Sequence, residues 1–493
     1  MENTVTPSRK VRTRFAPSPT GALHIGGLRT ALINYLYAKQ YNGEFILRIE
    51  DTDSARNQNS QIKEILDDLE SLSLIPDESF ICPGEYGPYL QSQRMDRYRE
   101  RMVELLKKKK VYRCFCSPKD SDSSQREEYL YSGKCRKLSE AEVKEKLTAK
   151  APFCIRLEVD NSKTYEWNDY VRGRMSVPAS SMGDIILMRS SGAPTYNFAV
   201  TVDDYEMKIT DVFRGEEHLS NTPYQLALYE AFGWQESIPN YGHLSVILGA
   251  SGKKISKRDA DSEKYFVTYF LDKGFYPEAL LNYLLILGWT EGEREFFTLR
   301  ESIESFSTAQ LSGAPSSFDY RKLEWMSQSY LNQLELLQYL NFSLPFFRGE
   351  YEEFTLKPSK RREFAICFRS RVKYASFLDD LATQFYAEEY LTAEVIKELK
   401  SFSNITTILR ETLKELQGDA LNRFEEFELR LTLKKLLSKL AVPPPTFYQS
   451  LRLSLIGEKE GLPLHSVIYL LGLQRATCRL ERVLDLFPPK DSS

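Results

Sequence analysis

The sequence predicts an α/β protein in which a parallel-sheet domain, interrupted by a mixed α/β subdomain, is followed by an all-α C-terminal region. Three observations lead to this prediction. A strand, a helix and a second strand follow one another within about 40 residues near the N-terminus. A polar, charged stretch with short strand-like segments comes next, and beyond about residue 320 Leu and Phe recur mainly at helical spacing.

The N-terminal elements form a βαβ unit. Residues 11–16 alternate as in a strand, and the Pro- and Gly-containing segment 17–21 ends that strand. From Gly27 to about Gly43, apolar residues recur at helical spacing, and residues 45–49 form the second strand. Such a unit begins a parallel sheet. The segments 194–203 and 209–213 are expected to add strands to it.

The remaining segments differ in character. Helical spacing is found at 62–74 and 92–110, whereas strand-like pieces at 153–159 and 171–177 lie in a polar surrounding. We therefore expect an inserted mixed subdomain over about 111–190. In the C-terminal part, residues 425–441 are typical of the helical pattern, and three consecutive prolines at 443–445 mark a break.

Composition narrows the class of protein. The 493 residues are 42% hydrophobic and 12% aromatic, which excludes a disordered chain and suggests about three to five domains. The net charge of −3 means that any RNA contact must use local basic patches. Seven scattered cysteines fit a reducing compartment, and neither a signal peptide nor an apolar run of about 20 residues is present. We expect a cytoplasmic protein without a membrane segment.

The first candidate binding motif runs from Ala16 to Gly21 and continues as His24-Ile25-Gly26-Gly27. It lies between a strand and a helix N-terminus, where open α/β sheets bind ligands. Glycines let the backbone approach a phosphate or an adenine, and the free N–H groups of the helix favour anions. An ordinary tight turn is the alternative.

The second candidate motif is a glycine-rich loop with four cations, Gly249-Ala250-Ser251-Gly252-Lys253-Lys254-Ile255-Ser256-Lys257-Arg258. Lysine ammonium groups on such a loop can follow the charge that builds on a leaving pyrophosphate. A solvated basic loop is the alternative for this motif taken alone.

The order and spacing of the two motifs resemble the paired signatures of class I aminoacyl-tRNA synthetases. Further segments resemble the bacterial glutamyl-tRNA synthetases, closely over residues 11–330 and more loosely to the end of the chain. These segments are RIEDTD at 48–53, GPY at 87–89, PTYNFA at 194–199, RGEEHL at 214–219 and PEALLNY at 277–283. The resemblance implies a Rossmann-type catalytic domain and an anticodon-binding C-terminal region.

Glutamate carries two carboxylates and one ammonium, so its site needs two cations and one anion. Arginine suits carboxylates because its planar fork bonds both oxygens. The resemblance implies that Arg14 binds the side-chain carboxylate, Arg214 the α-carboxylate and Glu50 the ammonium. It also implies that Ala16, Ser18, Tyr196 and His218 line the pocket. Ordinary surface ion pairs are the alternative for the charged residues.

The implied reaction is attack by the glutamate α-carboxylate on the α-phosphate of ATP, with Mg²⁺ on the phosphates, followed by transfer to the terminal ribose of a tRNA. The resemblance also implies that tRNA must be bound before activation is efficient. We expect His24, Lys254 and Lys257 to be catalytic. The expected ATP contacts are His24, Gly26, Gly27, Lys254, Ser256 and Lys257.

The chain departs from the family pattern in two places. Gly27 stands where many class I enzymes have a second His, although glycine is usual in the glutamyl branch. Asp259-Ala260-Asp261 follows the basic loop, where the family often has His-Gly-Ala, and the added acid could weaken the loop's hold on phosphate.

Cys114, Cys116 and Cys135 are candidate ligands of a structural Zn²⁺, which usually takes four ligands. Some bacterial members of the family carry such a site in the inserted subdomain. Their last ligand can be a His two residues after the final Cys, where this chain has Lys137. Tyr131 is a candidate substitute, and free buried thiols are the alternative.

The resemblance suggests five parts and the partners tRNA(Glu), ATP and L-glutamate, with a monomeric enzyme. The parts are 9–110 (first catalytic half), 111–190 (acceptor-arm binding), 191–245 (second catalytic half), 246–322 (stem contact, with the basic loop) and 323–493 (anticodon binding). A glutaminyl enzyme is disfavoured because its C-terminal half is β-barrel, and a tRNA-modifying glutamyl transferase because it lacks that half. A form that also charges tRNA(Gln) and a catalytically inactive RNA-binding paralogue stay open.

Overall fold

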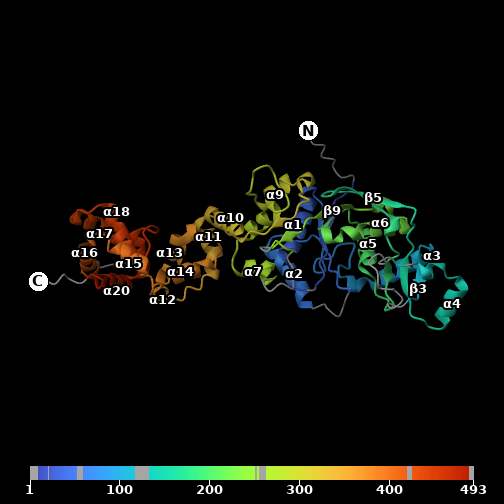
Figure 1. Ribbon diagram of the computed structural model, residues 1–493, viewed down its shortest axis with the longest axis horizontal. Coiled ribbons are helices and arrows are strands. Elements are labelled where there is room, and N and C mark those ends of the chain that lie inside the picture. Colours follow the sequence, from blue (N-terminus) through green and yellow to red (C-terminus); the bar gives the residue numbers. More distant parts are fainter. Residues whose placement is uncertain are drawn as a thin grey trace. The chain divides into compact units, whose positions relative to one another are not determined.

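The computed structural model describes residues 9–19, 21–52, 59–116, 131, 133–249, 252–254, 262–418 and 425–487. The chain forms two compact units (Figure 1). The N-terminal unit contains the residues up to Phe270 together with Pro277–Tyr320, and the C-terminal unit contains Leu271–Tyr276 and the residues from Arg321 onward. Within the described ranges, no helix has both the length and the apolar character needed to cross a membrane.

The predicted βαβ unit is present in the N-terminal unit. Strand β1 (Arg12–Phe15) and strand β2 (Glu44–Leu47) pair in parallel, with Arg14 opposite Ile46. Helix α1 (Ile25–Gln40) connects them and buries Leu28, Leu32 and Leu36, as its helical spacing requires.

Two further parallel strands, β8 (Asp211–Gly215) and β9 (Asn240–Leu244), extend this arrangement. Strand β1 lies beside β8, because the backbone N–H of Thr210 donates to the carbonyl oxygen of Arg12 at 2.9 Å. On the other side of β9, β5 (Thr164–Asp169) pairs in parallel at Asp169, and β6 (Gly173–Pro178) pairs antiparallel with β5. The C-terminal ends of β1, β2, β8 and β9 mark one edge of the sheet region.

One predicted strand is wrong. The segment 194–203 was expected to be a strand, but it belongs mainly to helix α5 (Tyr196–Glu206). Its continuous apolar run is buried because the helix packs into the core beside helix α6 (Thr222–Phe232). A short buried run does not distinguish a strand from a helix enclosed on most sides.

The inserted subdomain is mixed α/β, as expected. Strands β3 (Val111–Cys114), β4 (Cys154–Leu157) and β7 (Ile186–Met188) form an antiparallel sheet in that order. Helix α4 (Glu140–Thr148) begins at a capping box in which the side chains of Ser139 and Glu142 bond each other's backbone N–H groups.

The other elements of the N-terminal unit are mostly helices. They are α2 (Asn59–Ser71), α3 (Met95–Lys107), α8 (Pro277–Ile286), α9 (Leu299–Ser305), most of α7 (Val267–Asp272), and the short strands β10 (Ile247–Leu248) and β11 (Ser316–Ser317).

The described part of the C-terminal unit is helical, as the sequence predicts, and has a core of its own. Helix α17 matches the predicted 425–441, and α18 begins within the proline run. The helices are α10 (Tyr320–Gln333), α11 (Leu336–Ser343), α12 (Glu352–Leu356), α13 (Ser359–Phe368), α14 (Phe377–Tyr386), α15 (Ala393–Leu399), α16 (Ile405–Gln417), α17 (Glu426–Leu440), α18 (Pro444–Ile456), α19 (Leu464–Leu471) and α20 (Leu473–Leu484). The five-part functional division stays a prediction, because compactness does not show which part contacts which part of a tRNA.

Candidate active site

A cavity of about 380 Å³ opens where strands β1, β2, β8 and β9 end. This is the edge at which open α/β sheets bind ligands. Seven of its lining residues are those expected to contact the amino acid: Arg14, Ala16, Ser18, Glu50, Tyr196, Arg214 and His218. Four more are expected ATP contacts: His24, Gly26, Gly27 and Lys254. The fold therefore brings the predicted residues of the described chain together around one space.

His24 caps the N-terminus of α1. Its Nδ1 accepts a hydrogen bond from the backbone N–H of Gly27 at 3.1 Å. In neutral histidine the other ring nitrogen, Nε2, then carries the proton and can donate. A Cβ on Gly26 would lie only 3.0 Å from the His24 ring, and one on Gly27 would lie 2.8 Å from Leu23. Gly26 therefore leaves room for the imidazole over the first helical turn, and Gly27 leaves room for the side chain of Leu23.

Arg14 is only 3% exposed and is held by an acid on α5. Its Nε donates to the two carboxylate oxygens of Asp204 at 3.2 and 3.4 Å. Asp204 also accepts from Nη1 of the buried Arg48 at 2.6 Å. Among the described residues, the Nη atoms of Arg14 have no hydrogen-bond partner, and Arg14 lines the cavity. One edge of this guanidinium is anchored while the other remains available to a ligand.

Glu50 follows β2, and its backbone N–H donates to the carbonyl oxygen of Pro17 at 3.0 Å. Its carboxylate lies 3.7 Å from Nη2 of Arg48. Burial raises the pKa of Glu50 to about 7, although Arg48 and Arg14 act to lower it. A ligand ammonium beside this carboxylate would favour its charged form.

Arg214 is 4% exposed and is hydrogen-bonded on three sides. Its Nη1 donates to Gln225 Oε1 at 3.1 Å, its Nη2 to Thr222 Oγ1 at 2.9 Å and its Nε to His243 Nε2 at 3.1 Å. A guanidinium has five N–H donors, so two remain for another ligand.

Tyr196 and His218 stack in the cavity wall, with ring centroids 5.1 Å apart. Burial lowers the pKa of His218 to about 4, assisted by the charge of Arg214. Burial likewise raises the pKa of Tyr196. Both rings are therefore uncharged near neutral pH and do not compete for the charges of a ligand.

Lys254 forms an isolated antiparallel bridge with Leu248 of β10. The N–H of Gly249 donates to the carbonyl of Lys253 at 2.8 Å, and Gly252 adopts a positive φ of 71°. Nζ of Lys254 lies 3.7 Å from a carboxylate oxygen of the half-exposed Glu217. Ser256, Lys257 and the departure at 259–261 lie outside the described residues.

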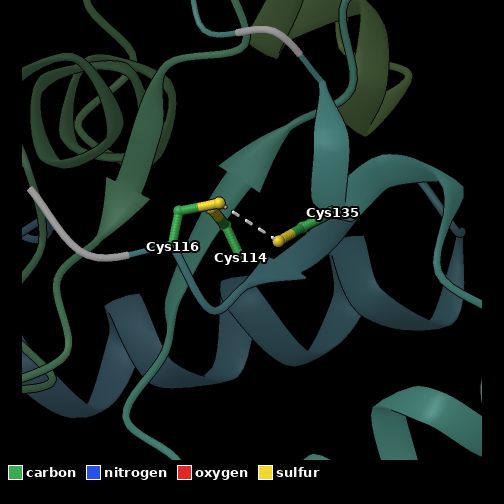
Figure 2. A group of neighbouring side chains, drawn as sticks. All are labelled: Cys114, Cys116 and Cys135. Carbon is green, nitrogen blue, oxygen red and sulfur yellow. Dashed lines mark hydrogen bonds between the residues drawn. The ribbon is translucent and has the colours of Figure 1, made fainter. Parts of the chain in front are cut away.

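Figure 2 shows the three candidate thiol ligands of the inserted subdomain converging on one point. The sulfurs of Cys114, Cys116 and Cys135 all lie within 4.8 Å of one another. The hydroxyl of Tyr131 lies 3.3 Å from the sulfur of Cys114 and 3.5 Å from that of Cys116. Zinc–sulfur bonds of about 2.3 Å in a tetrahedron separate sulfurs by about 3.8 Å, so these groups fit Zn²⁺ after small shifts.

The environment of the Cys cluster favours a thiolate at Cys114. Burial acts to raise the pKa of this thiol, but hydrogen bonds with Tyr131 and the Cys116 backbone, together with Arg156, lower it to about 7. Sequence reasoning missed Cys154, which lies opposite Cys114 in the β3–β4 pair. Only the register of the two strands reveals that proximity.

Other residues near the cavity were also missed. Asp204 could have been suspected, because two adjacent acids within an apolar run need buried cations. No local signal identifies His243 or its partner Asp169, which lie 74 residues apart in the sequence.

Comparison with known proteins agrees with this geometry. Residues 10–325 match the family described as tRNA synthetases class I (E and Q), catalytic domain. Residues 333–484 match the family described as an anticodon binding domain. The sheet, its ligand cavity and these matches define a class I aminoacyl-tRNA synthetase.

Similar proteins show which amino-acid family within the class I synthetases the chain resembles. The chain is 40% identical to the glutamate–tRNA ligase of Mycoplasma genitalium, with 95% of this chain and 97% of that protein covered. It is 38% identical to that of Geobacillus thermodenitrificans, with 97% and 99% covered. The crystal structure of a glutamate tRNA ligase from Elizabethkingia meningosepticum in complex with its amino acid matches with a TM-score of 0.83 at 32% identity, covering 97% and 99% of the two chains. The chain belongs to the glutamate–tRNA ligase family, which confirms the family predicted from the motifs.

Proposed function

We propose that the protein activates L-glutamate with ATP and transfers the glutamyl group to the 3′ end of tRNA(Glu). The observation that carries this proposal is the set of charges in one cavity: two buried arginines and one buried carboxylate. These complement the two carboxylates and the ammonium of glutamate.

Arg14 binds the side-chain carboxylate through its Nη edge, because its Nε edge is already held by Asp204. Arg214 binds the α-carboxylate through its two remaining N–H groups, and Glu50 accepts from the ammonium. Glutamine has nearly the same shape as glutamate but lacks the second charge, so the guanidinium of Arg14 supplies the discrimination.

In the first step, a glutamate α-carboxylate oxygen attacks the α-phosphorus of ATP, and the bond to the bridging oxygen breaks. Glutamyl-adenylate forms, and pyrophosphate leaves with the bonding electrons. Mg²⁺ bound to ATP would supply charge neutralisation on the phosphates. His24 donates to a phosphate oxygen, while Lys254 and Lys257 stabilise the leaving pyrophosphate. In the second step, the terminal ribose hydroxyl of the tRNA takes the acyl group and AMP is released.

Gly26, Gly27 and Ser256 complete the ATP site. The glycines bring the backbone of the first α1 turn close to the nucleotide. Ala16, Ser18, Tyr196 and His218 form the uncharged walls around the amino acid.

Cys114, Cys116, Cys135 and Tyr131 hold a structural Zn²⁺ in the inserted subdomain. Three sulfurs and a phenol oxygen form the ligand set in place of a final histidine. The ion would anchor the Cys135 segment to β3, and we assign it no part in the chemistry.

The parts 111–190 and 246–322 contact the acceptor arm and stem, and 323–493 contacts the anticodon. The C-terminal unit also carries clustered cations that could contact RNA, Lys357, Lys360, Arg361 and Arg362, and these are only partly available. Lys360 is 7% exposed, Lys357 lies 3.4 Å from a carboxylate oxygen of Glu425, and Arg361 donates to the carbonyl of Leu344. Arg362 is exposed. The anticodon assignment therefore rests mainly on the family match over 333–484.

ATP–pyrophosphate exchange tests the activation step. We expect glutamate-dependent exchange that rises strongly when tRNA(Glu) is added, in a monomeric cytoplasmic enzyme. An RNA-binding paralogue without catalysis would give no exchange under either condition. Nuclease footprinting should show protection of both the acceptor arm and the anticodon loop, and protection confined to the acceptor arm would contradict the assignment of 323–493.

A further inference from the structure

The surroundings of Arg214 differ from those of the other arginine at the amino-acid end of the cavity. Arg14 contacts a carboxylate, Asp204, whereas the three hydrogen-bond acceptors of Arg214 are an imidazole, a hydroxyl and an amide. Among the described residues, no carboxylate lies within 4.0 Å of the Arg214 guanidinium. Arg214 is thus oriented on three sides without direct contact with an anion.

The protonation of His243 follows from its three side-chain partners, Arg214, Thr222 and Asp169. The Thr222 hydroxyl lies 3.1 Å from Nε2, the same nitrogen that Arg214 contacts. An arginine N–H can only donate, so Nε2 of His243 must accept the bond from Arg214. The ring proton therefore lies on Nδ1, which is 2.5 Å from Oδ2 of Asp169. Both the His243 and Asp169 side chains have no exposed surface. Burial, together with the charge of Arg214, also lowers the pKa of His243, which keeps the ring neutral.

Arg214, His243 and Asp169 lie on three neighbouring strands of one sheet. Arg214 lies opposite His243 in the β8–β9 register, and Asp169 of β5 lies opposite Tyr241 of β9. Oδ1 of Asp169 additionally accepts from the backbone N–H of His243 at 3.1 Å. Side chains fixed by strand register and by a second layer of hydrogen bonds keep a more defined geometry than side chains on loops.

This arrangement has an electrostatic consequence. A buried cation without an anion is costly. Asp169 compensates through the polarised His243 ring, yet it does not occupy the donors that an incoming carboxylate needs. We propose that Asp169 and His243 are positioning residues that orient Arg214 and keep its outer N–H groups for the α-carboxylate of the amino-acid substrate. The inference rests on the proposed function, because it assigns the ligand of Arg214.

Two substitutions of His243 separate its hydrogen bond with Asp169 from its hydrogen bond with Arg214. His243→Asn places an amide near the position of Nδ1, so it can still donate to Asp169 but does not reach Arg214. His243→Gln extends one bond further and can accept from Arg214, but it loses Asp169. Tyr170→Phe is the matched control, since it removes a 2.8 Å hydrogen bond to Asp211 in the same sheet region, at the other end of β8.

The assay is tRNA(Glu) charging by the full chain, with KM measured for glutamate and for ATP. The glutamate analogue 4-amino-5-hydroxypentanoate, in which CH₂OH replaces the α-carboxylate, is added as a competitor of glutamate, and its inhibition constant reports binding without that group. With the Asn variant we expect the KM for glutamate to rise about ten- to a hundredfold. The KM for ATP and the inhibition constant should change by less than about threefold. The Gln variant should lie between wild type and Asn, and the Phe control should leave all three constants nearly unchanged.

Equal losses for glutamate and the inhibitor would overturn the inference, as would a Gln variant no better than the Asn variant. If melting curves show that the Asn variant does not fold, the Gln variant carries the same comparison: selective loss of glutamate binding supports the inference, and equal loss overturns it. A wild-type protein that charges no tRNA(Glu) would instead refute the proposed function, so the two failures are distinguishable.

Discussion

Replacing Arg14 by Gln separates substrate selection from support of the fold. The Nη edge of Arg14 faces a cavity, while its Nε edge bonds Asp204 at 3.2 Å. A bidentate contact between arginine and a carboxylate comprises two charge-assisted hydrogen bonds, each contributing about 1.5–3 kcal/mol. Loss of the charge and of one of these hydrogen bonds should therefore cost at least about 3 kcal/mol of binding free energy for glutamate in the transition state. We expect kcat/KM for glutamate to fall at least about a hundredfold, because 1.4 kcal/mol corresponds to a factor of ten.

The effect on stability should be smaller. Asp204 keeps its 2.6 Å bond to Arg48, so the substitution does not leave a buried carboxylate without a cation. We expect the melting temperature to fall by only a few degrees. Steady-state charging assays give kcat/KM for glutamate and for glutamine, and thermal melting gives the melting temperature.

Glutamine should lose much less activity than glutamate, which narrows the preference between them. Arg14→Lys is the matched control, and it should restore activity only in part because a point charge cannot form the two-pronged contact. Parallel losses for both amino acids, together with a strongly lowered melting temperature, would refute the specificity role.

Three further predictions concern the other charged and metal-binding groups. Because burial raises the pKa of Glu50 to about 7, its carboxylate loses charge as the pH falls, and the KM for glutamate should rise about tenfold between pH about 8 and about 6. Glu50→Gln should raise the KM for glutamate at the higher pH and flatten this pH profile. An unchanged profile in the variant would contradict the role of Glu50 in binding the ammonium. Lys257→Ala should lower kcat for charging by about a hundredfold and leave the KM for glutamate within about threefold of the wild-type value, because the ammonium acts on charge that develops in the transition state. An effect confined to KM would mean that the loop only holds ATP. Elemental analysis should find about one Zn²⁺ per chain, reduced severalfold in Cys135→Ser, and a metal-free wild type purified without chelators would favour free thiols instead.

Local patterns were sufficient for the elements that carry the cavity. The strand at 11–16, the helix after Gly27 and the strand at 45–49 have clear periodicity and clear stops, and all three are present. Parallel strands end at a common edge, so motifs that follow β1, β2 and β8 must meet there. The family resemblance assigned Arg14 and Arg214 to one site, and the common edge of these strands explains how residues so distant in sequence meet there.

Pairings between distant segments could not be predicted in the same way. The helix at Tyr196–Glu206 was mistaken for a strand because its burial hides the helical period. The bonds of Asp204 to Arg14 and of His243 to Asp169 depend on helix packing and strand register, which no single segment specifies. For the same reason, the proximity of Cys154 to Cys114 emerges only from the β3–β4 pairing.

Aminoacylation with labelled glutamate tests the central claim most directly. The purified full chain is incubated with ATP, Mg²⁺ and either tRNA(Glu) or tRNA(Gln), and label bound to the 3′ end is measured together with AMP. The account predicts an ATP-dependent, alkali-labile glutamyl ester on tRNA(Glu), with one AMP formed per glutamate attached. The tRNA(Gln) reaction shows whether the enzyme also accepts that tRNA. Absence of labelled tRNA(Glu) at micromolar enzyme, with a correctly folded protein, would contradict the account.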